Sequence, residues 1–377
     1  MINLGNFIAM PLSFKMKLII ITSILLIIGQ LTFAQSNERW IAFYNEEADL
    51  IGFKNAKGEI MIEPNFMGFT IAKTFDNIIA VMEENNGKYD SYYLTKSGKK
   101  VGYDKLHIID NGADCEREGF IRFRDSKTDK VGMFDTNGNI AIPAVYNELS
   151  KTYNGMIWAL LGAEKKYWDD HKESGCNHYS WKDGQKLLLS TDNKVLVDNF
   201  EYENHIDYFS FRLTKEPSTE STEISFKGKN EMYYTFTDIE KSFDNWLKNN
   251  FLNEPTKDKL VNFSMDSLTY WKGSWITESK EQFIEQNFDL IINKLNVTLN
   301  TNSDSFVTIN GLNPFIYTGD IYANYFNTCG ESIEEKHPVL AVIINNRTAS
   351  DLKQDHFEFL KTENGYRFLS FSISSEK

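Results

Sequence analysis

The sequence predicts a mainly β repeat array of antiparallel meander units, propeller-like or solenoid-like in arrangement, followed by an α+β domain. Two observations lead to this fold class. Gly58, Gly98 and Gly138 stand at a constant interval of 40 residues in similar surroundings, and a fixed period of that length is typical of repeat architectures. Near Thr237 the alternation of apolar residues gives way to spacings of three and four, which indicates helices.

Each repeat unit reads as an apolar strand, a polar turn and a second apolar strand, which is the pattern of a β-hairpin. Four units surround Gly58, Gly98, Gly138 and Asn193, where asparagine replaces glycine because it tolerates a positive φ. A fifth, degenerate unit at residues 224–229 is expected to cap the array. A further strand precedes each turn, at residues 40–44, 78–82, 120–124, 156–160 and 208–212. One such meander cannot bury both of its faces, so neighbouring units must stack.

Residues 40–235 resemble the bacterial WG-repeat family, whose units pair two short strands through a glycine turn and end in proline and an aromatic residue. The third unit carries the resemblance best, through Gly132, Met133, Phe134, Asp135, Gly138, Ile140, Ile142, Pro143 and Tyr146. The Trp-Gly pair that gives the family its name is absent, and Ile51-Gly52 and Val131-Gly132 stand in its place. The resemblance implies a binding or scaffolding repeat and brings no catalytic residues.

An insertion separates the third turn from the fourth, which follows after 55 residues instead of 40. It lies within residues 163–185, and insertions in repeat arrays often form loops on the binding face. His171, Cys176 and His178 in this insertion are residue types that bind zinc. They lack the paired spacing of a structural zinc site, so a solvated polar loop is the preferred interpretation and no metal is predicted.

The C-terminal part, residues 236–377, is predicted to be an α+β domain. Asp238 can cap a first helix, a second helix is expected at residues 255–265, and Ser279 with Gln282 begins a third. Strands follow at residues 338–344, 356–362 and 366–373, the last two joined by a tight turn at residues 363–365.

This layout resembles the NTF2-like or cystatin-like domains of secreted Bacteroidetes proteins. The resemblance implies a cone whose mouth could hold an apolar or carbohydrate ligand. Candidate pocket residues are Tyr270, Trp271, Trp275, Tyr317, His337 and His356. The alternative, which we prefer, is that these rings fill the core beneath the sheet.

The N-terminus predicts export. Lys15 and Lys17 precede a short apolar run and a small-residue site at Ala34, which is the layout of a signal peptide at residues 1–35, with Met16 as an alternative start. No transmembrane helix is expected after cleavage. Cleavage removes two lysines and no acid, so the net charge falls from −13 to −15. A chain this acidic repels phosphate backbones, which excludes nucleic acid as an expected partner.

The sequence shows no constellation typical of an enzyme, and neither a catalytic residue nor a cofactor is predicted. Ser97 and Lys100 have the spacing of a Ser-x-x-Lys pair, but a repeat turn explains both. Two functions remain open. The first is an exported envelope protein, periplasmic, surface-bound or secreted, whose repeats bind a protein or a glycan without catalysis. The second is ligand binding or hydrolysis centred on the C-terminal domain.

Three cysteines, Cys115, Cys176 and Cys329, leave room for one disulfide bond whose pairing the sequence does not decide.

Overall fold

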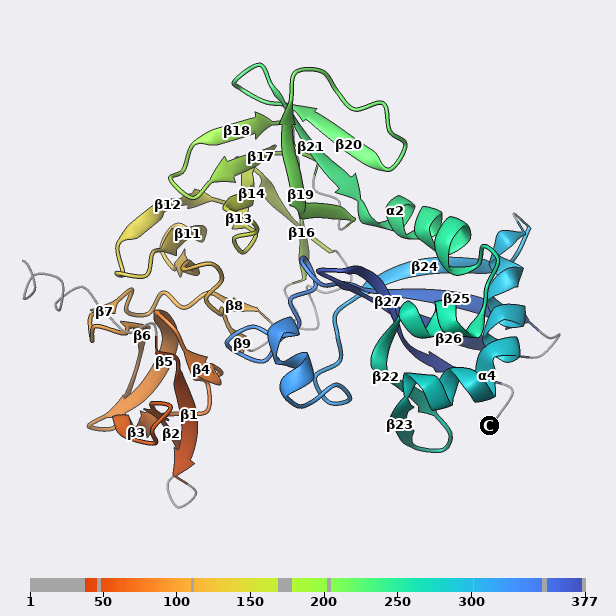
Figure 1. Ribbon diagram of the computed structural model, residues 1–377. Coiled ribbons are helices and arrows are strands. Elements are labelled where there is room, and N and C mark those ends of the chain that lie inside the picture. Colours follow the sequence, from red (N-terminus) through yellow and green to blue (C-terminus); the bar gives the residue numbers. More distant parts are fainter. Residues whose placement is uncertain are drawn as a thin grey trace, which may run out of the picture.

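A computed structural model describes residues 38–45, 49–109, 112–168, 178–201, 205–300, 302–347 and 351–374. The predicted signal peptide lies outside these residues. The chain is mainly β: several small antiparallel sheets follow one another along an arc, and a six-stranded sheet with helices on one face completes the molecule (Figure 1). Within the described residues, none of the helices combines the length and the apolar character that crossing a bilayer requires.

The five predicted repeat units each contain three main strands. In chain order these are β1 (Trp40–Asn45), β2 (Leu50–Lys54) and β3 (Ile60–Phe66); β5 (Ile78–Asn85), β6 (Lys88–Thr95) and β7 (Lys100–Val101); β10 (Ile121–Asp125), β11 (Lys130–Phe134) and β12 (Ile140–Tyr146); β14 (Met156–Leu161), β17 (Gln185–Ser190) and β18 (Val195–Asp198); and β19 (Ile206–Thr214), β20 (Glu223–Lys227) and β21 (Tyr233–Asp238). Short strands link the units: β4 (Thr74–Phe75), β8 (Ile108–Ile109), β9 (Gly112–Ala113) and β13 (Glu148–Leu149). The first four units are simple meanders, as predicted, and the first two share one seven-stranded sheet.

The second and third strands of each meander are joined by the same five-residue turn. Its fourth position has a positive φ in every case, at Gly58 (83°), Gly98 (86°), Gly138 (66°) and Asn193 (61°). Its first position is a short polar residue whose side chain accepts a hydrogen bond from the backbone N–H of the fifth, as Asp135 does from Asn139 at 2.8 Å and Thr95 does from Lys99 at 3.0 Å. The predicted register of the turns is therefore confirmed.

The fifth unit keeps the turn but not the position that the sequence suggested. Gly228 occupies the first position, where its N–H donates to the carbonyl of Met232, and Glu231 takes the positive φ of 61°. The strand order also changes, because β21 lies between β19 and β20. Gly228 still contacts the fourth unit through a bridge to Val197, so this unit packs against the array as an altered end.

Successive units stack through shared apolar clusters, as predicted. The second and third units share one cluster, the third and fourth a second, and the fourth and fifth a third. Within the third unit, Ile121 and Phe123 face the second unit while Val131 and Met133 face the fourth. Because one meander is buried on both faces, each unit depends on its neighbours for its core.

The glycine of each Ile/Val-Gly pair lies where the third strand passes closest to the second. A β-carbon on Gly52 would be 2.6 Å from the carbonyl oxygen of Ile62, and one on Gly132 would be 2.6 Å from that of Ile142. Both glycines lie at register shifts in the pairing of the two strands. The close approach explains why the repeat requires glycine here although φ is not positive.

The C-terminal residues form a six-stranded sheet in the order β23-β22-β27-β26-β25-β24. Its strands are β22 (Ser264–Trp271), β23 (Trp275–Ser279), β24 (Ser305–Asn310), β25 (Val339–Arg347), β26 (Leu352–Thr362) and β27 (Gly365–Ser372), and its helical segments are α2 (Ile239–Trp246), η2 (Leu247–Phe251), α3 (Lys257–Asn262), α4 (Lys280–Leu295), η3 (Asn296–Leu299) and η4 (Asp320–Tyr325). The predicted caps are confirmed, since Asp238 accepts from the N–H of Lys241 and Ser279 from that of Gln282. The segments α2, η2, α3 and α4 pack on one face of this sheet around an aromatic-rich core, whereas η4 belongs to the other face.

The other face of this sheet is covered by residues 311–338, which connect β24 to β25 and reach the repeat array (Figure 1). Cys329 in this segment forms a disulfide bond with Cys115, just ahead of the third unit. Thr328 accepts hydrogen bonds from Lys73 and Thr74 in the first unit, and Glu331 forms an ion pair of 2.8 Å with Lys151. One connecting segment therefore holds the sheet against several units at once.

Candidate functional site

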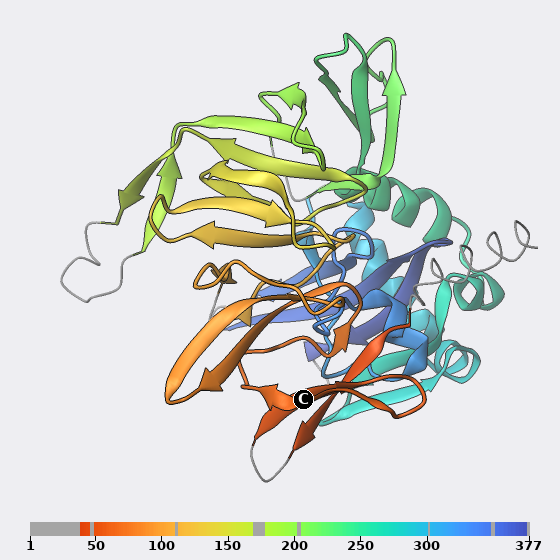
Figure 2. The same cartoon turned by 90° about the vertical axis from the view of Figure 1, so that its left-hand side faces the viewer.

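The predicted insertion forms a two-stranded hairpin, β15 (Glu164–Tyr167) and β16 (Tyr179–Lys182), between the first two strands of the fourth unit. Its root is fixed, because the buried Asn147 side chain donates to the carbonyl of Ala163 and accepts from its N–H, at 2.7 and 2.9 Å. Lys165 adds an ion pair of 2.5 Å to Asp129 in the third unit. The yellow-green hairpin projects beyond the neighbouring sheets (Figure 2).

One face of this hairpin is aromatic. Lys165 and Tyr167 lie opposite Trp181 and Tyr179, and alternation places these four side chains on the same face. The ammonium of Lys165 lies 4.1 Å from the ring centroid of Tyr179 and 5.5 Å from that of Trp181. Tyr167 on this face is 44% exposed, and the adjacent Trp168, which alternation places on the opposite face, is 51% exposed. Exposed aromatic rings on a fixed root are well suited to bind a partner, because they are large and lose little conformational entropy.

The metal alternative is not assembled by the described residues. His171 and Cys176 lie outside them, and His178 stacks against Trp168 with ring centroids 5.9 Å apart. In the described ranges no group of three or more His, Cys, Asp or Glu side chains is placed to hold a metal ion.

Three of the six candidate pocket residues come together. Trp275, Tyr317 and His356 line a cavity of about 280 Å³ on the sheet face that residues 311–338 cover. This face is opposite the one on which α2, α3 and α4 pack. We name the cavity the sheet-face cavity. Its further lining residues are Gly311, Asn313, Ile316, Val339, Glu358, Ser370 and Ser372.

The other three candidates lie elsewhere. Tyr270 packs toward the helices, against Phe283, and donates to Glu278 at 3.1 Å. Trp271 contacts Trp275 edge-on without lining the cavity. His337 is buried beside Tyr325, with Nδ1 3.0 Å from the carbonyl of Lys361. Tyr270 and His337 therefore fit the alternative interpretation, in which these rings fill the core, better than a role in lining a pocket.

Polar groups on two neighbouring strands supply the chemistry of the sheet-face cavity. Glu358 on β26 lies opposite Ser370 on β27, and His356 lies opposite Ser372. Ser370 donates to Glu358 Oε2 at 2.5 Å and the Tyr317 hydroxyl donates to the same oxygen at 3.4 Å. Burial, followed by the charge of Glu358, raises the pKa of Tyr317, so this hydroxyl keeps its proton and acts as a donor. These contacts form a binding constellation around one carboxylate.

Sequence reasoning missed Glu358, Ser370 and Ser372. A signal for them was present, because His356 and Glu358 alternate with the apolar Phe357 and Phe359. The tight turn at residues 363–365, confirmed by the pairing of Thr362 with Gly365, fixes which residues of β27 lie opposite them.

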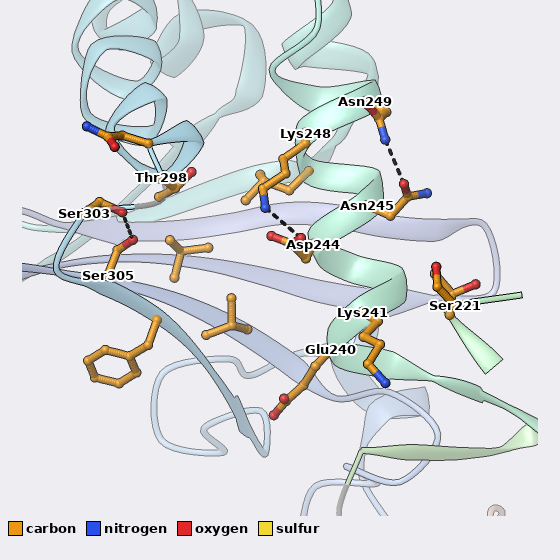
Figure 3. Close-up of a pocket in the computed structure, with 16 residues that line it drawn as sticks. Ser221, Glu240, Lys241, Asp244, Asn245, Lys248, Asn249, Thr298, Ser303 and Ser305 are labelled. Carbon is orange, nitrogen blue, oxygen red and sulfur yellow. Dashed lines mark hydrogen bonds and ion pairs between the residues drawn. The ribbon is translucent and has the colours of Figure 1, made fainter. Parts of the chain in front are cut away.

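A larger hollow of about 740 Å³ lies between α2 and the edge strand β24 (Figure 3). Many of its polar side chains pair with each other along the same element, as Lys248 does with Asp244 and Asn249 with Asn245. Ser303 and Ser305 also share a hydrogen bond, of 2.8 Å. These pairs show that part of the polar lining of the hollow already has hydrogen-bond partners within the protein.

The fold defines a β-repeat protein with an attached mixed sheet, and a comparison with family models agrees for one stretch. Residues 132–166 match the model described as the WG containing repeat. The match begins at Gly132, runs through β12 and β14, and ends in β15. It therefore includes the close-approach glycine, the turn glycine and the root of the hairpin. No curated protein and no solved structure matches the chain.

Proposed function

We propose that this chain is an exported, non-catalytic binding protein of a bacterial cell envelope, and that the aromatic hairpin contacts its partner, a protein or a glycan. The observation that carries the proposal is the exposed aromatic face on a fixed root. Tyr and Trp are enriched where proteins bind partners, since each ring contributes a large apolar area and a polar group. The repeat array serves as the rigid support for this hairpin.

Two features support export. The disulfide between Cys115 and Cys329 suits an oxidising compartment, where such bonds form and persist. The N-terminal residues have the layout of a signal peptide. Sequencing the N-terminus of the protein recovered from outside the cytoplasm should give a start at Gln35 or Ser36. An intact Met1 or Met16 in the cytosolic fraction would overturn this part of the proposal.

We also propose an open, solenoid-like arrangement of the units and an NTF2-like kinship for residues 236–377. The units follow one another along an arc whose inner side is occupied by residues 311–338 (Figure 1), which favours an open array over a closed propeller. The kinship is supported by helices on one face of a six-stranded, mostly antiparallel sheet.

Co-sedimentation of the purified chain with the envelope fraction of its source organism tests the partner proposal. Tyr167→Ala and Trp181→Ala should lower the bound fraction, whereas Lys166→Ala and Ser180→Ala, on the opposite face of the hairpin, should leave it unchanged. Digesting the envelope fraction with protease beforehand separates the two partner classes, because only a glycan partner survives. Equal binding by both pairs of variants would rule out the aromatic face as the contact surface.

A second function, binding of a small ligand, is favoured by the sheet-face cavity. The cavity brings Trp275, Tyr317 and His356 together with a hydrogen-bonded carboxylate. Ser372 lies opposite His356, but the described contacts include no hydrogen bond between them, and Ser370 is paired with Glu358 instead. This pairing favours binding over hydrolysis, since a serine nucleophile needs an adjacent base such as histidine.

A further inference from the structure

Glu358 is the centre of the sheet-face cavity. It lies in the middle of β26, between β25 and β27, and its side chain is on the face that residues 311–338 cover. Its neighbours across the two strand pairs are Ala341 and Ser370. Glu358 is half-buried, so its carboxylate is partly desolvated and its hydrogen bonds and charge partners contribute to the stability of the folded state.

The donors to Glu358 in the described part of the chain both reach the same carboxylate oxygen. Ser370 and Tyr317 both donate to Oε2, at 2.5 and 3.4 Å. Among the contacts of the described residues, Oε1 receives no hydrogen bond. A carboxylate can accept about four hydrogen bonds, so at least half of the capacity of Glu358 is available to a ligand in the cavity.

The charge of Glu358 is also uncompensated within the cavity. Neither lysine nor arginine occurs among the described residues that line it. His356 is the one lining residue that could carry a positive charge, and no ion pair joins it to Glu358 in the described part of the chain. A partly desolvated carboxylate without a cation is unfavourable, and a cationic ligand would remove that cost.

The walls of the cavity suit a cation as well. Trp275 and Tyr317 present aromatic rings, whose negative faces attract ammonium groups. The volume of about 280 Å³ is at the small end of ligand pockets, so it admits a single ring or a short chain.

We propose that the sheet-face cavity binds a small organic ammonium ion, with Glu358 as its counter-ion and with Trp275 and Tyr317 as its aromatic walls. This inference rests on the second proposed function, the binding of a small ligand, and adds the chemical class of that ligand. An apolar ligand or a carbohydrate, the two classes that the resemblance suggested, would not need the unpaired charge.

Calorimetric titration of the full chain with cyclohexylamine, cyclohexanol and glucose tests the proposal. The first two probes have the same ring and differ in charge, while glucose represents a neutral sugar. We expect cyclohexylamine to bind and cyclohexanol to bind at least about ten-fold more weakly, as an ion pair in a partly buried site would require.

Glu358→Gln keeps the shape of the side chain and an acceptor for Ser370, but removes the charge. It should abolish the preference for cyclohexylamine, whereas Glu363→Gln, which changes net charge equally outside the cavity, should retain it. Thermal unfolding of both variants checks that the fold is kept. Equal affinity for the amine and the alcohol, or binding of glucose alone, would overturn the ammonium inference and leave small-ligand binding in place. If none of the three probes binds at millimolar concentration, small-ligand binding itself is overturned.

Discussion

Cys115 and Cys329 are bonded to each other across 214 positions of sequence, and their bond joins the repeat array to the segment that covers the C-terminal sheet. Both cysteines are buried, within the apolar cluster of the first two units. The bond therefore has a second effect besides closing a long loop. It fixes residues 311–338 at the place where Thr328 and Glu331 contact the array.

We expect Cys115→Ser to destabilise the protein by about 2–5 kcal/mol, the usual cost of removing a native disulfide that closes a long loop. Cys329→Ser should cost the same, and the double variant should cost no more than either single one, because all three lack the same bond. Chemical unfolding with and without reductant measures the effect. Alkylation of Cys115 and Cys329 in the unreduced, unfolded protein would show that the bond is absent.

Limited proteolysis should depend on this bond. The boundary predicted near residue 235 lies inside β21, where Thr235 is fully buried, so cleavage is expected further on, at the exposed Asn253 and Glu254, and should give a C-terminal fragment beginning near residue 254. Without reductant this fragment should stay attached to the array, and with reductant the two should separate on a denaturing gel. A fragment that separates without reductant would contradict the linkage.

The turn glycines provide a test of the repeat register. Gly98 has a φ of 86°, and a β-carbon there would meet no atom within 4 Å, so Gly98→Val adds only backbone strain. We expect a loss of about 1–3 kcal/mol for valine and a much smaller loss for Gly98→Asn, since asparagine occupies the same position at residue 193. Thermal unfolding decides between this expectation and chance spacing, for which valine and asparagine would give equal midpoints.

Gly138 should behave differently from Gly98, although the sequence suggested that the turns are equivalent. A β-carbon there would lie 3.1 Å from methyl groups of Thr95 and Val101 in the preceding unit. Gly138→Asn should therefore be clearly more destabilising than Gly98→Asn in the same unfolding assay. If the two asparagine variants unfold alike, the stacking of one turn on the next contributes nothing at this position.

The close-approach glycines should be the most sensitive positions of the repeat. Gly132→Ala places a β-carbon 2.6 Å from the carbonyl of Ile142, so either the strand pairing or the bulge must shift. We expect a loss of about 1–3 kcal/mol, as for overpacking of a core. Gly68→Ala is the matched control, because a β-carbon there meets nothing within 4 Å and φ is not positive. Similar unfolding midpoints for both variants would contradict the close approach.

The repeat was predictable from the sequence because its constraints are local. A turn that needs a positive φ selects glycine or asparagine, which makes Gly58, Gly98 and Gly138 visible at a constant spacing of 40 residues and Asn193 visible after the insertion. The fifth turn was misplaced because Glu231 takes the positive φ, and glutamate gives no such signal. The changed strand order of that unit depends on packing at the end of the array, which a periodic pattern does not describe.

The sites were less predictable because they depend on distant parts of the chain. Aromatic residue types pointed to Trp275, Tyr317 and His356, and the structure brings these three together. Glu358 became a candidate only when residues 311–338 were seen to cover its face of the sheet. The sequence left the disulfide pairing undecided for the same reason, since three cysteines far apart in sequence allow three pairings.

The last prediction concerns Asp114 and Arg122, a buried ion pair at the start of the third unit. Arg122 donates to both carboxylate oxygens, at 2.7 and 3.1 Å, and also to the carbonyl of Leu149 at 2.9 Å. Removing one member of a buried pair leaves an uncompensated charge, so Arg122→Met should cost about 3–5 kcal/mol. The exposed pair of Arg39 with Asp76 has the same two-pronged geometry, and Arg39→Met should cost at most about 1 kcal/mol.

The pH dependence of stability distinguishes loss of the ion pair from loss of packing. Burial alone would raise the pKa of Asp114, but the attraction and hydrogen bonds of Arg122 outweigh it and lower the pKa to about 2. The folded pKa lies below the unfolded one, so the contribution of Asp114 is complete above about pH 4 and is lost as the pH falls toward 2. Without Arg122, burial dominates and raises the folded pKa above the unfolded value. In Arg122→Met, folded Asp114 then takes up its proton at a higher pH than unfolded Asp114 does, so the variant gains stability as the pH falls. The difference in unfolding free energy between this variant and the wild type should therefore narrow on acidification from pH 7 to 4. A constant gap across that range, measured by urea unfolding, would assign the effect of the substitution to packing rather than to charge.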